Sequence, residues 1–227
     1  MSVLGSNRQK EAIISASLLS ADLCSLEREI KSALAAGCDW IHFDVMDGHF
    51  TKNISYGIPV LEACKKAVPE AFYDVHLMVD KPDCFAKLFS DAGADMITFH
   101  YEAMTNVYST VNLIKSLGKK AGISVKPDTP ASVLYPYFDS ADMFLLMTVE
   151  PGFGGQAFDK RSPEKIKGLK SEITARGSKA LIEVDGGINA STAPIVTDAG
   201  ADVLVSGSYI FGAEDMKAAV DSLRVRR

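Results

Sequence analysis

The chain has 227 residues, of which 47% are hydrophobic, and a formal net charge of −5, which suits one α/β barrel domain, a class that often reaches ~250 residues. Its basic residues are scattered and no apolar run approaches the ~18 residues of a membrane span, which excludes a nucleic-acid-binding or membrane-embedded protein. Because its first twelve residues also lack the apolar segment of a secretory signal, we expect a cytoplasmic protein with a small-molecule partner.

Short apolar runs rich in β-forming residues recur along the chain, and each is followed by a stretch with helical periodicity. The runs begin near Ile13, Trp40, Phe72, Met96, Ala121, Met143, Ala180 and Val203. Eight such units at a mean spacing of ~27 residues favour a closed, parallel (β/α)8 TIM barrel over an open doubly wound sheet. We therefore predict a single barrel domain over residues 1–227, with residues 1–10 as a loose N-terminal extension.

Two further features support the repeating unit. Residues 36–39, 92–95 and 199–202 share the pattern Ala-Gly-x-Asp just before a predicted strand, and the glycine suits the left-handed residue that ends a helix. The longest interval lies between the sixth and seventh strands, where residues 150–156 form a glycine-rich segment. Extra length at the carboxyl end of a barrel strand is where working loops are found.

Four side chains of the metal-ligand type, His42, Asp44, His76 and Asp185, lie towards the ends of the second, third and seventh runs. Residues two apart in a strand share a face, so His42 and Asp44 point the same way. The carboxyl ends of parallel strands meet at one end of a barrel, where two imidazoles and two carboxylates would suit a divalent transition metal. A satisfied buried polar network is the alternative, but the shared position of all four favours the metal site.

Glycines gather at the ends of the last three strands. They lie at residues 152–155, at 186–187 and at 207, where Ser208 opens a predicted short helix to Phe211. Backbone N–H groups in such loops bind phosphate, and barrels often do so after strands seven and eight. Turn geometry alone explains any single glycine, but their clustering predicts a phosphate-bearing substrate.

Five segments carry a family resemblance. SLLSAD at residues 17–22, WIHFDVMDGHF at 40–50, DVHLMV at 74–79, LMTVEPGFGGQ at 146–156 and EVDGG at 183–187 closely resemble the sequences of ribulose-phosphate 3-epimerases. The resemblance runs from the first strand to the eighth. It implies a metal-dependent isomerase of the pentose phosphate pathway that inverts C3 of D-ribulose 5-phosphate to D-xylulose 5-phosphate through a cis-enediolate.

The resemblance also assigns roles to residues. His42, Asp44, His76 and Asp185 match the ligands of one divalent metal ion, and Asp44 and Asp185 match the catalytic acid–base pair. Zinc and iron are the first candidates for the ion, followed by cobalt and manganese. The matching substrate-binding set is Ser17, Met46, His76, Met78, Met147, Gly152, Phe153, Gly154, Gly155, Gly186, Gly187, Gly207 and Ser208. The family also implies a homo-oligomer.

The other two histidines are left out of the ligand set. His100 ends the fourth strand beside Glu102, where an indirect structural role and a substrate contact are both open. His49 lies in the loop after the second strand, where we expect a solvated side chain.

The sequence departs from the family at Ala16, at Thr51 and Lys52, and at Asp128. None of these removes a proposed ligand, but residues 51 and 52 leave the substrate preference open. The main alternative is therefore an epimerase of a hexulose 6-phosphate such as D-allulose 6-phosphate. A phosphate-binding decarboxylase is disfavoured because the lysine of its Asp-x-Lys-x-x-Asp pattern is missing after Asp44, and an inactive binding protein is disfavoured because all four ligand-type residues remain.

Overall fold

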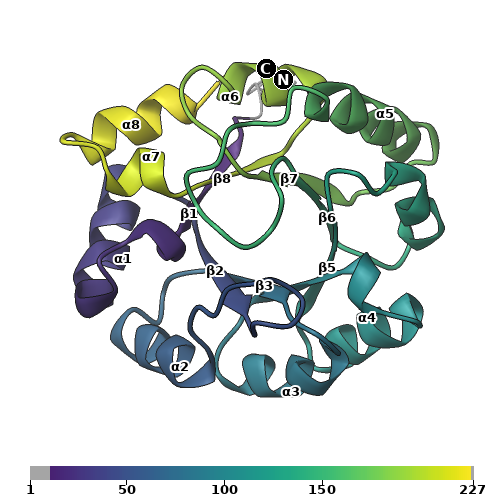
Figure 1. The fold of residues 1–227 in the computed structure, drawn as a ribbon, viewed down its shortest axis with the longest axis horizontal. Helices are drawn as coiled ribbons and strands as arrows, with labels where there is room; N and C mark the ends of the chain where they lie inside the picture. The colour runs from purple at the N-terminus through teal and green to yellow at the C-terminus, as the bar shows by residue number, and fades with distance from the viewer. Residues whose placement is uncertain (1–10, 226–227) are drawn as a thin grey trace, which may run out of the picture.

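A computed structural model describes residues 11–225, so the predicted N-terminal extension lies outside the described residues. Eight parallel strands close into a barrel in sequence order, each paired with the next and β8 with β1. The helices form a ring around it (Figure 1). The strands are β1 Ile13–Ser17, β2 Trp40–Met46, β3 Tyr73–Met78, β4 Met96–His100, β5 Lys120–Val125, β6 Met143–Met147, β7 Leu181–Asp185 and β8 Val203–Ser206. The predicted TIM barrel is confirmed.

The α-helices are α1 Leu26–Ala36, α2 Ile58–Ala67, α3 Asp83–Asp91, α4 Val107–Ser116, α5 Ser162–Ala175, α6 Ala193–Ala199, α7 Ser208–Phe211 and α8 Met216–Leu223. Single 3-10 turns are η1 Leu18–Ser20, η2 Leu23–Ser25 and η3 Tyr101–Ala103. Within residues 11–225, no helix is both long enough and apolar enough to cross a membrane.

The unit after β5 departs from the predicted strand and helix. A 3-10 helix, η4 Ala131–Tyr137, takes the place of an α-helix and contains Pro136. Proline lacks the N–H that an α-helix interior uses and its ring clashes with the preceding turn, so this segment is held as a short, tighter helix.

The aspartate of the Ala-Gly-x-Asp pattern has a structural role that the sequence alone did not reveal. Asp39, Asp95 and Asp202, which precede β2, β4 and β8, each accept a backbone N–H from the preceding strand, at 2.8, 2.9 and 3.0 Å. The glycines before them have φ of 105°, 107° and 117°, the left-handed region predicted for them. Together these residues end a helix and hold the next strand beside its neighbour.

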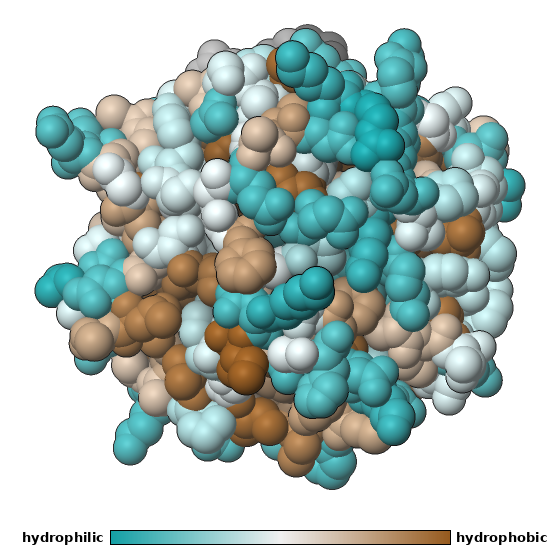
Figure 2. Space-filling model, viewed as in Figure 1, coloured by the Kyte–Doolittle hydropathy of each residue, from teal (hydrophilic) through white to brown (hydrophobic). Residues whose placement is uncertain are grey.

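The amino-terminal end of the barrel is closed by an apolar layer. Met96, Met143 and Val203 are buried there, and the rings of Trp40 and Phe72 stack beside them with centroids 4.5 Å apart. Figure 2, drawn in the view of Figure 1, looks onto the opposite, carboxyl end, where the loop after β6 crosses the mouth of the barrel. Polar side chains that point into the barrel therefore reach solvent only at its carboxyl end.

Candidate active site

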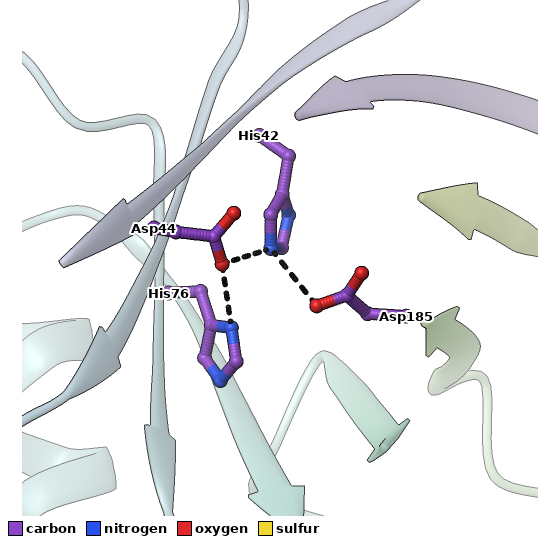
Figure 3. A group of neighbouring side chains, drawn as sticks. All are labelled: His42, Asp44, His76 and Asp185. Atoms are coloured by element: carbon purple, nitrogen blue, oxygen red, sulfur yellow. Dashed lines mark hydrogen bonds and ion pairs between the residues drawn. The ribbon is translucent and has the colours of Figure 1, made fainter. Parts of the chain in front are cut away.

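The four predicted ligand residues meet at the carboxyl end of the barrel (Figure 3). His42 and Asp44 come from β2, His76 from β3 and Asp185 from the end of β7. One ligand-type atom from each lies within 4.8 Å of all the others. The two imidazoles and Asp44 are buried, whereas the Asp185 side chain keeps 18% of its surface exposed.

Asp44 sits between the two imidazoles. Its Oδ1 lies 3.2 Å from His42 Nε2 and 3.2 Å from His76 Nδ1, and its Oδ2 accepts a hydrogen bond from the Ser17 hydroxyl at 2.7 Å. The Asp185 Oδ2 atom lies 4.0 Å from His42 Nε2. Nitrogen and carboxylate atoms thus converge on one point, as the ligands of a small divalent cation do.

Asp74, also on β3, fixes the orientation of His42. Its Oδ2 lies 2.7 Å from His42 Nδ1, and both side chains are fully buried. If Nδ1–H donates to this carboxylate, His42 Nε2 presents a lone pair towards Asp44, and it has no hydrogen-bond partner among residues 11–225. An imidazole anchored by a carboxylate at one nitrogen and open at the other is the usual form of a metal-binding histidine, so these residues fit a divalent ion.

A second group is formed by His42, Asp74 and Glu183. Asp74 and Glu183 lie two residues before His76 and Asp185 on β3 and β7, nearer the amino-terminal end of the barrel. Both Glu183 oxygens are buried without a hydrogen-bond partner among the described residues, and burial followed by the Asp74 charge raises the pKa of Glu183 well above its ordinary value. The 2.7 Å between His42 Nδ1 and Asp74 is a hydrogen-bond distance, shorter than the separation of two ligands on one ion. We therefore interpret this group as support for His42.

Asp44 and Asp185 have opposite protonation tendencies. Burial alone would raise the pKa of Asp44, but the adjacent His42 and His76 hold it well below its ordinary value. Burial, followed by the charge of Asp44, raises the pKa of Asp185 to about 6. Burial opposes a charge on His42, yet Asp44 and Asp74 raise its pKa well above 6.5. A pair of carboxyls whose pKa values are pushed apart is the arrangement that acid–base enzymes use.

A cavity of about 290 Å³ opens above the cluster. Asp44 and Asp185 line it together with every member of the predicted substrate-binding set except His76, which lies beneath it. Met46, Met78 and Met147 are buried in its wall. Ser20, Asn189 and Tyr209 also line it and were not predicted.

The glycines around the cavity have distinct structural reasons. Gly186 has φ 119°, and a Cβ there would lie 2.5 Å from Val149 Cγ2. Gly207 has an ordinary φ of −109°, but a Cβ would lie 2.7 Å from the Ser20 Oγ atom. Gly186 is therefore required by the backbone, and Gly207 by a close approach inside the cavity.

The glycine-rich loop after β6 is tied to the loop after β2. Asn53 Nδ2 donates to the Gly152 carbonyl oxygen at 2.8 Å, and Gln156 Nε2 donates to the carbonyl oxygens of Glu150 and Phe153 within the loop. Phe153 has 59% of its surface exposed. This loop is therefore braced by side-chain amides that the sequence did not single out.

Ser55 supports Asp44 from outside the barrel. Its hydroxyl donates to the Asp44 carbonyl oxygen at 2.7 Å and accepts from the Met46 N–H at 3.0 Å. It replaces a strand partner at the point where β2 ends, and no sequence pattern marked it.

The two histidines outside the ligand set differ. His49 is solvated, with its side chain 82% exposed, as predicted. His100 is fully buried, does not line the cavity, and places its Nε2 3.0 Å from His76 Nε2. Of its two open roles, the structure supports the indirect one.

The departures from the expected family pattern do not line the cavity, but Thr51 lies beside Gly152, which does. Thr51 is buried, and its hydroxyl donates to the Asn53 carbonyl oxygen at 3.3 Å. Lys52 is exposed. Asp128 forms an exposed ion pair with Arg161 at 2.9 Å. None of these residues belongs to the surface of the cavity.

Comparisons with known proteins agree with one another. A model of the ribulose-phosphate 3 epimerase family matches residues 13–211. The ribulose-phosphate 3-epimerase of Bacillus subtilis is 46% identical over 93% of this chain and 97% of its own length. That of Methanocaldococcus jannaschii is 47% identical over 93% of this chain and 89% of its own.

Solved structures of lower sequence identity share the fold. The 3-keto-L-gulonate-6-phosphate decarboxylase of Vibrio cholerae matches with a TM-score of 0.71 at 14% identity, over 94% of this chain and 95% of its own. The 3-hexulose-6-phosphate synthase of Salmonella typhimurium matches with a TM-score of 0.68 at 21% identity, over 93% and 96%. At such identities the likeness concerns the barrel alone.

Proposed function

This chain belongs to the ribulose-phosphate 3-epimerase family and is an isomerase of the epimerase class, and we propose that it inverts C3 of D-ribulose 5-phosphate to give D-xylulose 5-phosphate. The observation that carries the proposal is the pair Asp44 and Asp185, which line one cavity from β2 and β7 and have pKa values shifted in opposite directions. Inversion requires one group to remove the C3 proton from one face and another to return a proton to the opposite face.

Two carboxyls on strands that are not neighbours suit this task, because each approaches the cavity from a different side. We assign the ionised carboxylate as the base and the protonated carboxyl as the acid, with the roles exchanged for the reverse reaction. The intermediate between the two proton transfers is a cis-enediolate, whose negative charge must be stabilised in place.

The cluster His42, Asp44, His76 and Asp185 supports a divalent metal ion at this point. Such an ion, when bound, would supply positive charge that stabilises the enediolate. Zinc or iron suits two imidazoles and two carboxylates, and cobalt or manganese is accepted by the same ligand types. Asp44 and Asp185 would then serve both as ligands and as the acid–base pair.

Two other parts of the cavity support a sugar phosphate. The backbone N–H groups near Gly154, Gly155, Gly187 and Ser208 offer donors for a phosphate. Met46, Met78 and Met147 provide an apolar wall from the strands beside the carboxyls, which would keep water from the intermediate. The hexulose 6-phosphate alternative is favoured by no specific observation, and the two relatives described above are named for the pentulose reaction.

The proposal is tested by NMR of the metal-loaded protein with D-ribulose 5-phosphate. Conversion to D-xylulose 5-phosphate is expected, and Asp185→Asn is expected to lower the rate by at least ~100-fold because it removes one of the two carboxyl groups that exchange a proton with C3. Asp139→Asn, at an exposed position, is the matched control and should keep the wild-type rate. Failure of the wild type to convert this substrate would refute the proposal.

The homo-oligomer, the cytoplasmic location and the place in the pentose phosphate pathway stay predictions. Light scattering tests the first of these, since a monomer of 24.4 kDa would contradict it.

A further inference from the structure

A series of polar side chains in contact with one another leads away from His76. The His76 Nε2 atom lies 3.0 Å from His100 Nε2, and His100 Nδ1 lies 3.2 Å from Glu102 Oε2. His76 and His100 are fully buried on β3 and β4, and Glu102 lies in η3 directly after β4. The Phe50 ring covers His100 with centroids 4.6 Å apart. Of these three residues, only His76 belongs to the proposed ligand set.

Glu102, the member of this series farthest from His76, is itself held in place by hydrogen bonds. Its Oε1 accepts the Lys126 backbone N–H at 2.8 Å and also accepts the Thr129 hydroxyl. Both contacts come from the segment after β5, so two separate donors hold one oxygen while the other faces His100. A carboxylate has only acceptors to offer, which requires His100 to carry its hydrogen on Nδ1.

The positions of the remaining hydrogens follow from this constraint. A neutral His100 with its hydrogen on Nδ1 presents a lone pair at Nε2, so the contact with His76 Nε2 is a hydrogen bond only if His76 donates from Nε2. His76 Nδ1 then carries a lone pair, and it lies 3.2 Å from the Asp44 Oδ1 atom. Two acceptors face each other there, and a cation between them turns this repulsive contact into a favourable one.

We propose that Glu102, acting through His100, sets the hydrogen of His76 on Nε2 and thereby presents the Nδ1 lone pair to the divalent cation. This inference rests on the cation of the proposed function. Glu102 and His100 are positioning residues, since neither lines the cavity. His42 has the shorter arrangement, a direct bond to Asp74, so each imidazole ligand is oriented by a carboxylate on its far side.

The substitution Glu102→Gln separates this role from simple packing. A glutamine keeps the shape but offers one oxygen and one NH2 group. If its oxygen serves the Lys126 N–H and the Thr129 hydroxyl, its NH2 faces His100 Nδ1 and makes that atom an acceptor. The hydrogens of both imidazoles then reverse, and His76 carries its hydrogen on Nδ1, where it blocks the cation.

Thr129→Val is the matched control. It removes one donor from the same carboxylate but leaves Glu102 an acceptor towards His100. The hydrogen positions on both imidazoles are expected to stay as in the wild type. A thermal melt followed by circular dichroism verifies that both variants fold.

The experiment measures Zn²⁺ affinity by competition with a chromophoric chelator, together with the ring tautomers of ¹⁵N-histidine-labelled protein by NMR. The chain has only four histidines, so single substitutions assign the ring signals. We expect Zn²⁺ to bind Glu102→Gln ~10- to 100-fold more weakly than the wild type, with the His76 hydrogen moved from Nε2 to Nδ1. Thr129→Val should change the affinity by less than about threefold, since the orienting bond remains.

Three results have separate meanings. Wild-type affinity in Glu102→Gln, or an equal loss in Thr129→Val, overturns the positioning role. A wild-type His76 with its hydrogen on Nδ1 overturns it as well. Absence of Zn²⁺ binding by the wild type refutes the metal of the proposed function instead, and the ring tautomers then still decide whether Glu102 orients His76.

Discussion

Asp185→Asn is expected to stabilise the metal-free protein while it abolishes activity. Burial and the neighbouring Asp44 charge raise the pKa of Asp185 to about 6, against an ordinary value of 3.8. The folded wild type must therefore hold an ionised carboxylate at neutral pH in a place that disfavours it. Asparagine has a similar shape and carries no charge, so it removes this cost.

The magnitude follows from the pKa difference between the folded and unfolded states. A carboxyl whose pKa rises on folding contributes most stability below its unfolded pKa, and that contribution is lost as pH rises towards the folded value. For Asp185 the loss occurs between about pH 4 and 6, and above that range it reaches ~3 kcal/mol. Since the side chain is 18% exposed, we expect a gain of ~1 to 3 kcal/mol for Asp185→Asn at pH 8, and a smaller gain at pH 5.

The assay is urea denaturation of chelator-treated protein at pH 5 and pH 8, with Asp139→Asn as the control whose effect should not depend on pH. Saturating Zn²⁺ should then reverse the order of stability. An ion at about 1,000 times its Kd stabilises the wild type by ~4.1 kcal/mol, more than the gain of Asp185→Asn, whereas the variant lacks one proposed ligand. If Asp185→Asn is no more stable than the wild type at pH 8, or if its advantage does not grow from pH 5 to pH 8, the cost assigned to the buried Asp185 carboxylate is wrong.

Three other substitutions test the cavity walls. Gly186→Ala should lower the free energy of unfolding by ~2 to 4 kcal/mol in urea, because φ is 119° and the methyl group meets Val149; wild-type stability would contradict this. Gly207→Ala should raise KM for the sugar phosphate ~10-fold or more, because its methyl group would lie 2.7 Å from Ser20 Oγ and displace that hydroxyl within the cavity; an unchanged KM would argue against the phosphate position. Asn53→Ala should speed proteolytic cleavage within residues 150–156 by loosening a braced loop, and equal cleavage rates would show that its bond to Gly152 does not hold the loop.

Residues whose roles depend on local pattern were predictable from the sequence. His42 and Asp44 are two apart on one strand, so strand geometry alone places them on one face. The eight apolar runs and the left-handed glycines at positions 37, 93 and 200 are also local signals, and the structure has both. Convergence of β2, β3 and β7 then followed from barrel closure.

Residues whose roles depend on distant partners were not predictable in this way. Ser55 braces Asp44 from a loop eleven residues later, and Asn53 meets Gly152 across 99 residues. Neither contact has a spacing rule, because loop conformation decides it. The contact of His76 with His100 required the register of β3 on β4, in which His76 is paired with Thr98, and a composition pattern does not give register.

Segment 131–137 shows that a local sequence pattern can also predict an element without predicting its form. Its apolar spacing suggested a helix, but Pro136 within it favours the 3-10 form. Helical periodicity identified an element here and not its hydrogen-bond pattern.

Asp44 and Asp185 are proposed to transfer protons on opposite faces of one substrate, and the position of deuterium early in the reaction tests this most directly. D-ribulose 5-phosphate is incubated with the metal-loaded protein in D2O, and product and remaining substrate are examined by NMR before equilibrium. Two separate groups predict D-xylulose 5-phosphate that carries solvent deuterium at C3 from its first appearance, with much less label in the remaining substrate. Product that retains the protium of its substrate would mean that a single group moves the proton between faces, and would contradict proton transfer by two carboxyls.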